Sequence, residues 1–448
     1  MPFASSGNRH STQFGVSWQP LLRRAFAGVR YTGRRVAGVI PLTKTVKAAV
    51  SELAEAPGVR ECLAWFAREK QWINERHLEF CRIPAPTFRE QERAAWFARE
   101  FRSLGCAVKT DKAGNVLAWP GGLSEGPFVA VTAHLDTVLA PRSPDEIRVR
   151  PDGRFAGPGV SDNGAGLAAL LAIAAALEAS PRIEDLEWRF LLVANVCEEG
   201  EGNLSGMRYL CRHSPLARKI HAFLVLDGPN LDHVTATALA SRRFEIAMNG
   251  PGGHSWTDFG TANPVHALAR LVTCFNDQMR DTAGTRCSYN FGTIEGGVSV
   301  NSIPAHASAK LDLRSEDPAK IEELTTVLAL AAEKAVEAEN ERGTGRVTAK
   351  IREIGSRPGG RLPADSRLLG AVRAVDSFLG LRAALDCAST DANIPLSLGM
   401  EAVSLGAGGQ GGGAHTAGEW FSPEGRDLGL RRILLAMTML ARGASERL

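Results

Sequence analysis

The sequence predicts an α/β fold with a smaller α+β unit inserted into it, and three observations support this. Three runs of apolar and β-branched residues, at 128–134, 188–196 and 222–226, have the composition of strands buried on both faces. Each run ends in histidine or acidic residues, and ligands bind at the carboxyl ends of the strands in an α/β sheet. Near residue 237 the pattern changes to the alternation that is typical of half-exposed strands.

The part of the chain around the first buried strand is expected to be mostly helical. Apolar and aromatic residues recur at three- and four-residue intervals over 51–104, which predicts amphipathic helices. The stretch 108–119 has the pattern of a polar hairpin. After the first buried strand, Ser161 and Asp162 are suitable caps for an Ala/Leu-rich helix over 167–179.

The inserted unit is expected to contain strands and helices of its own. These are the strand 243–249, a helix over 263–280, the strand pair 291–303 and 306–314, a charged helix over 318–341 and the strand 346–354. After a Pro/Gly-rich link the α/β pattern returns, with the helix 367–379, the strand 401–405, a glycine-rich loop and a final helix. We therefore predict one larger α/β domain made of residues 51–236 and 354–448, with residues 237–353 inserted in it.

Composition argues against several classes of protein. Hydrophobic residues make up 44% and charged residues 23% of the 448 positions, as in ordinary globular proteins. The net charge of +3 is too small to indicate binding to nucleic acid, and no run approaches the ~20 apolar residues of a membrane span. The eight cysteines include no C-x-x-C pair, so we expect reduced thiols in a cytoplasmic enzyme.

The first 50 residues differ from the rest of the chain. They carry basic residues but no Asp or Glu, and we expect residues 1–50 to form a disordered basic extension. Arg34 and Arg35 precede a short apolar run, so export by a twin-arginine signal is the alternative. Pro41 and Lys44 soon break that run, which favours the cytoplasm.

Histidine and acidic residues gather where the predicted strands meet loops. His134 and Asp136 emerge side by side, because alternate residues of a strand point the same way. The remaining members follow later in the chain and are Asp162, Glu198, Glu199, Asp227 and His415. Two imidazoles and three carboxylates suit two divalent metals that share a bridging carboxylate. Mixed nitrogen and oxygen ligands indicate two Zn²⁺, with Co²⁺ or Mn²⁺ as substitutes.

Glu198 and Glu199 need separate roles, because adjacent residues at a strand end point in different directions. One can bind metal, while the other takes a proton from a metal-activated water and passes it to the leaving amine. Either acid alone is more often simply solvated. Two adjacent carboxylates that emerge from a buried strand repel each other unless a cation compensates, so the doublet favours a metal-dependent hydrolase.

Eight short motifs carry the strongest signal in the sequence. They are AHLDTV (133–138), GPGVSDNGAG (157–166), CEEGEG (197–202), VLDG (225–228), GPGGHSW (250–256), GGVSVNSIP (296–304), STDAN (389–393) and AHTAGEW (414–420). In this order they resemble the co-catalytic zinc peptidase family, which includes peptidase T, aminoacylase, carboxypeptidase G and succinyl-diaminopimelate desuccinylase. The resemblance covers roughly residues 60–445. It implies a catalytic domain with a mixed central sheet flanked by helices, and an inserted lid that is also the dimerisation domain.

The resemblance also implies a ligand set. His134, Asp162 and Asp227 would hold one zinc ion. Glu199, Asp162 and His415 would hold the other, with Asp162 as the bridge.

Further roles follow from the same resemblance. Asp136 would orient the first histidine ligand, and Glu198 would be the general base. His254 resembles the histidine that crosses from the partner subunit to stabilise the tetrahedral oxyanion. Asn301 and Arg314 resemble the lid residues that grip the substrate, and Arg314 is suited to a carboxylate.

One departure from the family pattern bears on the substrate. Many relatives carry a second Asp or a Met, then Lys, after the bridging Asp, where this chain has Asn163 and Gly164. This form is closer to the peptidase T-like branch, so an aminopeptidase acting on di- and tripeptides is the leading interpretation. The alternatives are an N-acyl-amino-acid deacylase of the same family and a non-catalytic binding protein on the same fold. We expect a homodimer formed through the lid domain.

Two rival functions are less well supported by the sequence. Residues 406–411 satisfy the dinucleotide pattern G-x-G-x-x-G, but the loop continues to His415 instead of opening a hydrophobic helix. The chain also has no H-E-x-x-H sequence, which is the usual signature of a single-zinc peptidase.

Overall fold

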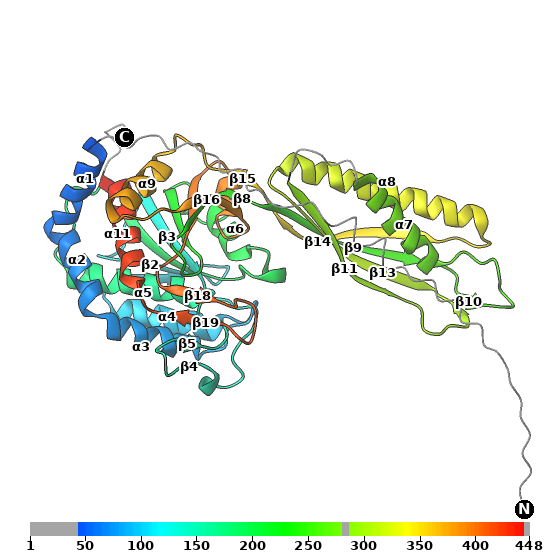
Figure 1. The fold of residues 1–448 in the computed structure, drawn as a ribbon, viewed down its shortest axis with the longest axis horizontal. Coiled ribbons are helices and arrows are strands. Elements are labelled where there is room, and N and C mark those ends of the chain that lie inside the picture. Colours follow the sequence, from blue (N-terminus) through cyan, green and yellow to red (C-terminus); the bar gives the residue numbers. More distant parts are fainter. Residues whose placement is uncertain (1–43, 280–285, 443–448) are drawn as a thin grey trace, which may run out of the picture. The chain divides into compact units, whose positions relative to one another are not determined.

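The computed structural model describes residues 44–279 and 286–442 (Figure 1). Within these residues a nine-stranded mixed sheet packed against helices confirms the predicted α/β fold class. Its strand order is β1-β2-β6-β3-β7-β17-β8-β15, and β16 pairs with β8. The strands are β1 (Ala107–Thr110), β2 (Val116–Trp119), β3 (Phe128–His134), β6 (Arg189–Asn195), β7 (Ile220–Leu226), β8 (His233–Ala238), β15 (Gly360–Arg361), β16 (Ala384–Ala388) and β17 (Glu401–Leu405).

The middle of this sheet is parallel. Strand β3 runs parallel to both β6 and β7, and β17 runs parallel to β7. All seven residues of β3 are buried, as its apolar composition predicts for a strand covered on both faces. Because parallel strands end at the same edge of a sheet, the residues that follow β3, β6 and β7 are brought together there.

Helices pack against the sheet and against one another. They are α1 (Lys44–Glu55), α2 (Pro57–Arg68), α3 (Lys70–Cys81), α4 (Gln91–Ser103), α5 (Gly164–Ala179), α6 (Ser205–Arg212), α9 (Arg367–Leu379), α10 (Asn393–Ser397) and α11 (Arg426–Arg442), with short 3₁₀ turns η1 (Pro144–Glu146) and η2 (Gly200–Gly202). Helix α5 is apolar on every side, because β3 and β6 cover one side of it while α2 and α3 cover others.

Helix α1 begins inside the range that the sequence assigns to the basic extension. It starts at Lys44, and its Val50 is fully buried in the main hydrophobic core. The rest of the expected extension, residues 1–43, lies outside the described residues.

A second part of the chain, from β9 to β14, has its own sheet and hydrophobic core, and we call it the lid. Its antiparallel sheet has the order β11-β13-β9-β14, and two helices pack against it. The elements are β9 (Ala240–Asn249), β10 (Gly253–His254), α7 (Pro264–Gln278), β11 (Cys287–Gly296), β12 (Ser302–Ile303), β13 (His306–Ser315), α8 (Pro318–Arg342) and β14 (Thr348–Arg357). Asn263 and Asp317 cap α7 and α8, and each precedes a proline at the first helical position. The predicted domain boundaries at 237 and 353 stay predictions.

A third, small antiparallel sheet links distant parts of the chain. It has the order β18-β19-β5-β4 and consists of β4 (Arg148–Val149), β5 (Phe155–Ala156), β18 (Gln410–Gly412) and β19 (Trp420–Ser422). This sheet places the loop before α5 beside the loop that carries His415.

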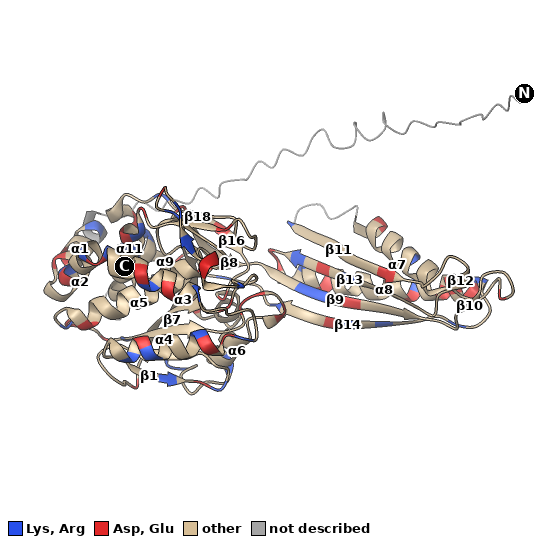
Figure 2. Cartoon of the chain, turned by 90° about the horizontal axis from the view of Figure 1, so that it is seen from below, with Lys and Arg blue, Asp and Glu red and all other residues tan. Residues whose placement is uncertain are grey.

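Figure 2 shows Lys and Arg interspersed with Asp and Glu over the helices and the lid strands. No helix among the described residues is long and apolar enough to cross a membrane.

Candidate metal centre and active site

Loops at the carboxyl edge of the parallel strands carry the polar residues that the sequence singles out. His134 is the last residue of β3, and Asp227 directly follows β7. Glu198 and Glu199 come shortly after β6, and both are buried. Asp162 lies in the loop that leads into α5. The fold therefore assembles one site from residues that are far apart in sequence.

Asp162 lies between the two histidines of this site. Its Oδ1 is 3.1 Å from Nε2 of His134, and its Oδ2 is 3.1 Å from Nε2 of His415. Oε1 of Glu199 is 2.9 Å from the same nitrogen of His415. Ligand atoms of His134, Asp162 and Glu199 lie within 4.8 Å of one another. Asp227 lines a cavity that Asp162, Glu199 and His415 also line. The structure thus brings together all five residues for which metal binding is predicted.

His415 reaches the site from the loop between β18 and β19. Its backbone is left-handed, with φ at 65°, which non-glycine residues adopt only rarely. Gly413, with φ at 72°, makes the preceding turn without a steric penalty. Strained backbone of this kind is frequent at functional sites, because the surrounding structure holds the side chain where it is needed.

Glu419 holds the loop that carries Asp162. Its side chain is 3% exposed, and its carboxylate accepts hydrogen bonds from the main-chain N–H groups of Gly159 (2.8 Å), Ser161 (2.7 Å) and Asp162 (2.9 Å). Because Glu419 lies four residues after His415, one short segment supplies a candidate ligand and fixes the loop of another. No role for Glu419 could be predicted from the sequence, in which it is one residue of the motif at 414–420.

Asp136 contacts more than the histidine that it is expected to orient. Its carboxylate Oδ1 lies 3.5 Å from Nδ1 of His134, and its main-chain oxygen is closer to that nitrogen, at 3.0 Å. The carboxylate also accepts hydrogen bonds from the main-chain N–H groups of Glu198 (3.0 Å) and Glu199 (2.9 Å). Asp136 therefore fixes the loop that carries both glutamates as well as contacting His134.

The electrostatics of the protein alone favour a bound cation. Burial, together with the charge of the adjacent glutamate, raises the pKa of Glu199 to about 7. Burial and the nearby charge of Asp162 raise the pKa of Asp227 well above its ordinary value. Burial opposes the charge of Asp162 as well, but hydrogen bonds from His134 and His415 lower its pKa. The hydrogen bond to Asp162 raises the pKa of His415 to about 9. Carboxylates that repel one another in this way are compensated by a divalent ion.

Glu198 has a buried partner that the sequence did not indicate. Nη1 of Arg357 lies 2.8 Å from Oε1 of Glu198, and both side chains are buried. Burial raises the pKa of Glu198, while the charge of Arg357 lowers it. Arg357 belongs to no motif, and its partner lies 159 residues away, so no local signal could have found the pair.

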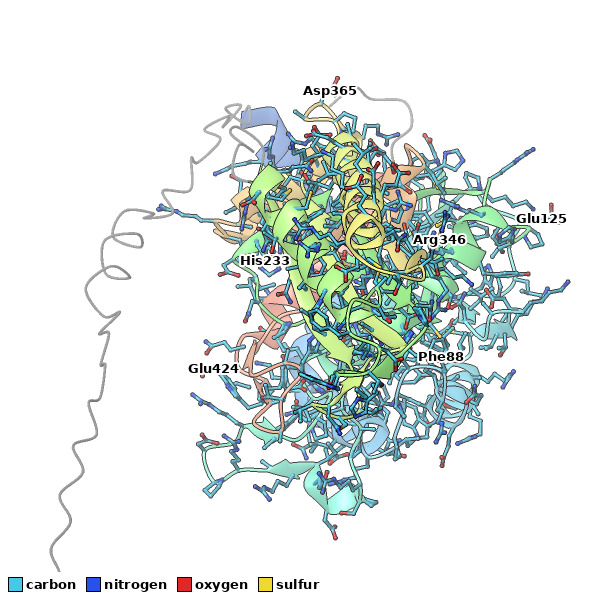
Figure 3. All side chains as sticks on the ribbon, turned by 90° about the vertical axis from the view of Figure 1, so that its right-hand side faces the viewer. Phe88, Glu125, His233, Arg346, Asp365 and Glu424 are labelled. Carbon is cyan, nitrogen blue, oxygen red and sulfur yellow. The ribbon has the colours of Figure 1, made fainter. Side chains whose placement is uncertain are left out.

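Four of the five candidate ligands, all except His134, line a cavity of about 480 Å³ that also contains three arginines, Arg243, Arg314 and Arg357. Asp312 binds two of them, Arg243 at 3.1 Å and Arg314 at 2.7 Å. These two guanidinium groups and one carboxylate leave a single positive charge, which suits a substrate carboxylate. His233 also lines the cavity and is labelled in Figure 3.

Four predicted site residues do not line this cavity: His134 and Asp136, which contact residues that do, and the lid residues His254 and Asn301. His254 ends β10 and is exposed, and its Nδ1 accepts a hydrogen bond from the main-chain N–H of Trp256 at 3.2 Å. The main-chain oxygen of Asn301 accepts a hydrogen bond from Ser255, so His254 and Asn301 lie close together in the lid. Oxyanion stabilisation by His254 and substrate contact by Asn301 stay predictions, because neither residue lines the cavity of its own chain among the described residues.

Asp391, from the motif at 389–393, is a further buried acid near the site. It is 1% exposed, and its Oδ2 accepts a hydrogen bond from the side-chain amide of Asn195 at 2.6 Å. Burial and the charge of Glu198 raise the pKa of Asp391 to about 7. No role for Asp391 is predicted from the sequence.

The structure argues against the dinucleotide interpretation and also against a serine-nucleophile site, which was not among the expectations from the sequence. The glycine-rich stretch 406–411 leads into β18 and not into a helix, so it lacks the geometry of a dinucleotide site. The stretch 122–126, GLSEG, has the spacing of a serine nucleophile elbow. It lies between β2 and β3, before the amino end of β3, whereas the polar cluster lies at the carboxyl end.

Comparison with known sequences identifies the family. Residues 130–439, well over half of the chain, match the sequence profile described as Peptidase family M20/M25/M40. The chain belongs to this family. The match includes all five candidate ligands, and the family predicted from the eight motifs is confirmed. This protein is therefore a member of a family of hydrolases.

Curated relatives resemble part of this family member. A probable carboxypeptidase from Aspergillus terreus is 28% identical over 212 residues, which are 45% of this chain and 47% of the relative. A Peptidase M20 domain-containing protein from Sordaria macrospora is 26% identical over 216 residues, with 45% of this chain and 47% of the relative covered. The chain thus spans about half the length of the curated relatives that it matches.

Solved structures share the fold over nearly their whole length. Aminopeptidase PepT from Bacillus cereus has a TM-score of 0.66 at 18% identity, covering 83% of this chain and 99% of that one. A tripeptidase from Staphylococcus aureus has a TM-score of 0.67 at 20% identity, covering 84% and 99%. The di-peptidase Dug1p from Saccharomyces cerevisiae has a TM-score of 0.68 at 14% identity, covering 87% and 100%. At these identities the similarity establishes the fold alone.

Proposed function

We propose that this protein is a metal-dependent hydrolase that cleaves a peptide or amide bond in small substrates. The observation that carries the proposal is the convergence of His134, His415, Asp162 and Glu199, with contact distances of 2.9–3.1 Å. Asp162, Glu199 and His415 of this cluster, together with Asp227, line a cavity large enough for a small ligand. Family membership supports the same reaction class.

The donor set fits two zinc ions. We assign His134, Asp162 and Asp227 to one ion and Glu199, Asp162 and His415 to the other. The position of Asp162 supports this division, because one of its oxygens faces each histidine. Mixed imidazole and carboxylate ligation would also accept Co²⁺ or Mn²⁺. Bound there, the ions would polarise a substrate carbonyl and lower the pKa of water.

The protein's own groups would move the protons and bind the transition state. Glu198, next to the ligand Glu199, would take a proton from the attacking water and pass it to the leaving amine. His254 would donate a hydrogen bond to the developing oxyanion. Because His254 and Asn301 are exposed in the lid, we propose that they act on the site of a partner subunit in a homodimer formed through the lid. Closure of the lid would exclude water.

Short peptides are the substrate class that we favour. Arg314, together with Arg243, would bind the substrate carboxylate, and Asn301 would contact the substrate from the lid. The solved structures with this fold include an aminopeptidase, a tripeptidase and a di-peptidase, and curated relatives are named probable carboxypeptidases. A di- or tripeptidase of the peptidase T-like branch fits these observations.

An N-acyl-amino-acid deacylase of the same family is the second candidate. Among the described residues that line the cavity, the acidic ones are Asp162, Glu198, Glu199 and Asp227, which are all candidate ligands or the proposed base. A free substrate amine would have to bind to one of these engaged groups, whereas an acylated amine needs no such partner. The arginines would bind the carboxylate of either substrate.

The cysteines support a reducing compartment. All eight are free, and five of them are buried. Free buried thiols are usual in proteins of the cytoplasm, and we propose that location for this chain.

Metal analysis combined with a substrate screen tests these proposals. We expect the purified protein to hold close to two zinc ions and to hydrolyse members of a panel of di- and tripeptides and N-acyl amino acids. Glu198→Ala should keep the zinc and lose turnover. Glu201→Ala, an exposed acid of the same loop, serves as the matched control and should retain activity. Zinc binding without any turnover by the wild type would indicate a binding protein, and turnover of acylated substrates alone would favour the deacylase.

A further inference from the structure

Arg357 donates hydrogen bonds to Glu198, the residue that we propose as the general base. Its Nη1 donates to Oε1 of Glu198 at 2.8 Å, and its Nη2 donates to the main-chain oxygen of the same residue at 2.5 Å. Nη1 also lies 3.1 Å from Oγ of Ser389. Arg357 is 8% and Glu198 is 4% exposed, so the pair is shielded from solvent.

The contact is unusual because one guanidinium group binds both the side chain and the backbone of its partner. A single hydrogen bond to the carboxylate would leave the torsions of Glu198 free to rotate. Two fixed donors in the planar fork of an arginine restrict both the peptide and the carboxylate. The hydrogen bond engages Oε1 and leaves Oε2 of Glu198 for a proton.

Arg357 is also the last residue of β14, the strand by which the chain returns from the lid. The residue before it, Ser356, donates its N–H to Oδ1 of Asn203 at 3.0 Å, and its oxygen accepts a hydrogen bond from Arg208. Asn203 and Arg208 follow the Glu198 loop in sequence. The end of the lid strand is therefore attached to the glutamate loop by two consecutive residues.

The other arginines of the cavity differ from Arg357 in their partners. Arg243 and Arg314 share the carboxylate of Asp312, which belongs to the lid strand β13. They remain able to bind a substrate anion, because together they carry one charge more than their partner. Arg357 is paired with a single carboxylate, that of Glu198, and is buried with it.

We propose that Arg357 is a positioning residue for Glu198, which it orients for proton transfer from the end of the lid strand. This inference rests on the proposed function, in which Glu198 is the base. The lid would then have a second role besides covering the cavity, because Arg357, the last residue of the lid strand β14, is hydrogen-bonded to the carboxylate of Glu198.

A double-mutant cycle tests the proposal. The variants are Arg357→Gln, Glu198→Gln, the two combined, and Arg357→Lys. Arg352→Gln is the matched control, because Arg352 is an exposed residue of the same strand and pairs with Glu245, outside the cavity. We expect Arg357→Gln to lower kcat by roughly 10- to 100-fold, as loss of a residue that orients a functional group commonly does. KM and the zinc content should stay close to those of the wild type. Arg357→Lys should recover part of the loss, and Arg352→Gln should lose nothing.

The combined variant separates positioning from other roles. If Arg357 acts through Glu198, the combined variant should be no slower than Glu198→Gln alone. A separate readout uses the metal-free protein, in which each single variant leaves one buried charge without its partner. We therefore expect each single variant to lower the melting temperature, and the combined variant to melt no lower than either.

Several results would overturn the proposal. A rise in KM with unchanged kcat would make Arg357 a substrate-binding residue, and loss of zinc would make it a support of the metal site. If the losses of kcat in the two single variants add up in the combined variant, Arg357 does not act through Glu198. If instead the wild type hydrolyses nothing or Glu198→Gln stays active, the proposed function fails. The melting temperatures of the metal-free variants would still report whether the pair forms.

Discussion

Two regions of the molecule are organised in opposite ways. The first is the strand-end cluster, which consists of the five candidate ligands His134, Asp162, Glu199, Asp227 and His415. The second is the tip of the lid, residues 253–259 and 298–302. In the cluster, His134 and Glu199 are buried, Asp162 and Asp227 are half-buried, and His415 is exposed. Residues such as Glu419 and Asp136 fix the loops of these ligands through main-chain hydrogen bonds. At the lid tip His254 is exposed, and Trp256 and Phe259 are 85% and 89% exposed. The cluster is thus preorganised within one chain, whereas the lid tip carries groups whose proposed targets lie elsewhere. Four predictions test this contrast, from the largest expected effect to the smallest.

Asp162→Asn should have the largest effect, because Asp162 is the one carboxylate in contact with both histidines. An amide cannot supply two anionic oxygens to two cations, so we expect zinc binding to fail and hydrolysis to fall to background. Zinc per chain, measured after dialysis, checks this. Asp152→Asn, in an exposed loop, is the control. A variant that retains both zinc ions would contradict the bridging role.

His254→Ala should reduce kcat by about 100-fold while zinc stays bound, because one oxyanion donor is worth roughly 100- to 1,000-fold. Mixing this variant with Glu198→Gln tests where the histidine acts. In a hybrid dimer one site would combine an intact Glu198 with His254 of the other chain, so activity should reappear on mixing. Mixtures that stay inactive would mean that His254 acts within its own chain or not at all.

Glu419→Gln should weaken the cluster without destroying it. The amide group can accept at one oxygen only, so at least one of the three N–H groups bound by Glu419 loses its partner. We expect zinc affinity to fall roughly 10- to 100-fold, as for other residues that support metal ligands. Titration with a competing chelator measures this. Glu424→Gln, an exposed acid nearby in sequence and labelled in Figure 3, should bind zinc like the wild type.

The stability of the metal-free protein should depend modestly on pH. The pKa of Glu199 is raised from 4.5 to about 7, so its contribution to folding becomes less favourable as pH rises through that range. The pKa of His415 is raised from 6.5 to about 9, so its stabilisation is complete below 6.5 and is lost as pH rises through 9. Both effects should lower the melting temperature between pH 5 and 9 by a few degrees.

Zinc should act in the opposite direction over the same pH range. Its ligands bind only after losing their protons, so the increase in melting temperature on adding zinc should grow as pH rises. Thermal melts of chelator-treated and zinc-loaded protein measure both trends. A metal-free melting temperature that rises with pH would contradict the assignment of Glu199 and His415.

Much of the fold could be predicted because local signals agree with tertiary structure. The helix 367–379 and the strand 401–405 have the predicted bounds, and Gly380 ends that helix with a left-handed backbone at φ 74°. The strand predicted over 291–303 instead runs from Cys287 to Gly296. Gly297, with φ at 83°, turns the chain there, and Ser302–Ile303 forms a separate short strand.

The candidate site was predictable only in part. The five candidate ligands could be found because each follows a recognisable strand or opens a helix, within a motif. Glu419, Arg243 and Arg357 could not, because their significance depends on partners that become neighbours only in the folded chain. Charged residues of this kind have no periodicity that separates a buried partner from a solvated one.

The position of β17 has a consequence for biosynthesis. This strand lies between β7 and β8 in the sheet, and His415 follows it, so residues 401–415 supply both a sheet strand and a candidate ligand. A nascent chain that has emerged from the ribosome only as far as residue 400 lacks both, although the lid sequence is already complete. The lid can therefore fold before the larger domain closes its sheet. Binding of both metal ions should wait until residue 415 has emerged, because a nascent chain that ends before it lacks one candidate ligand.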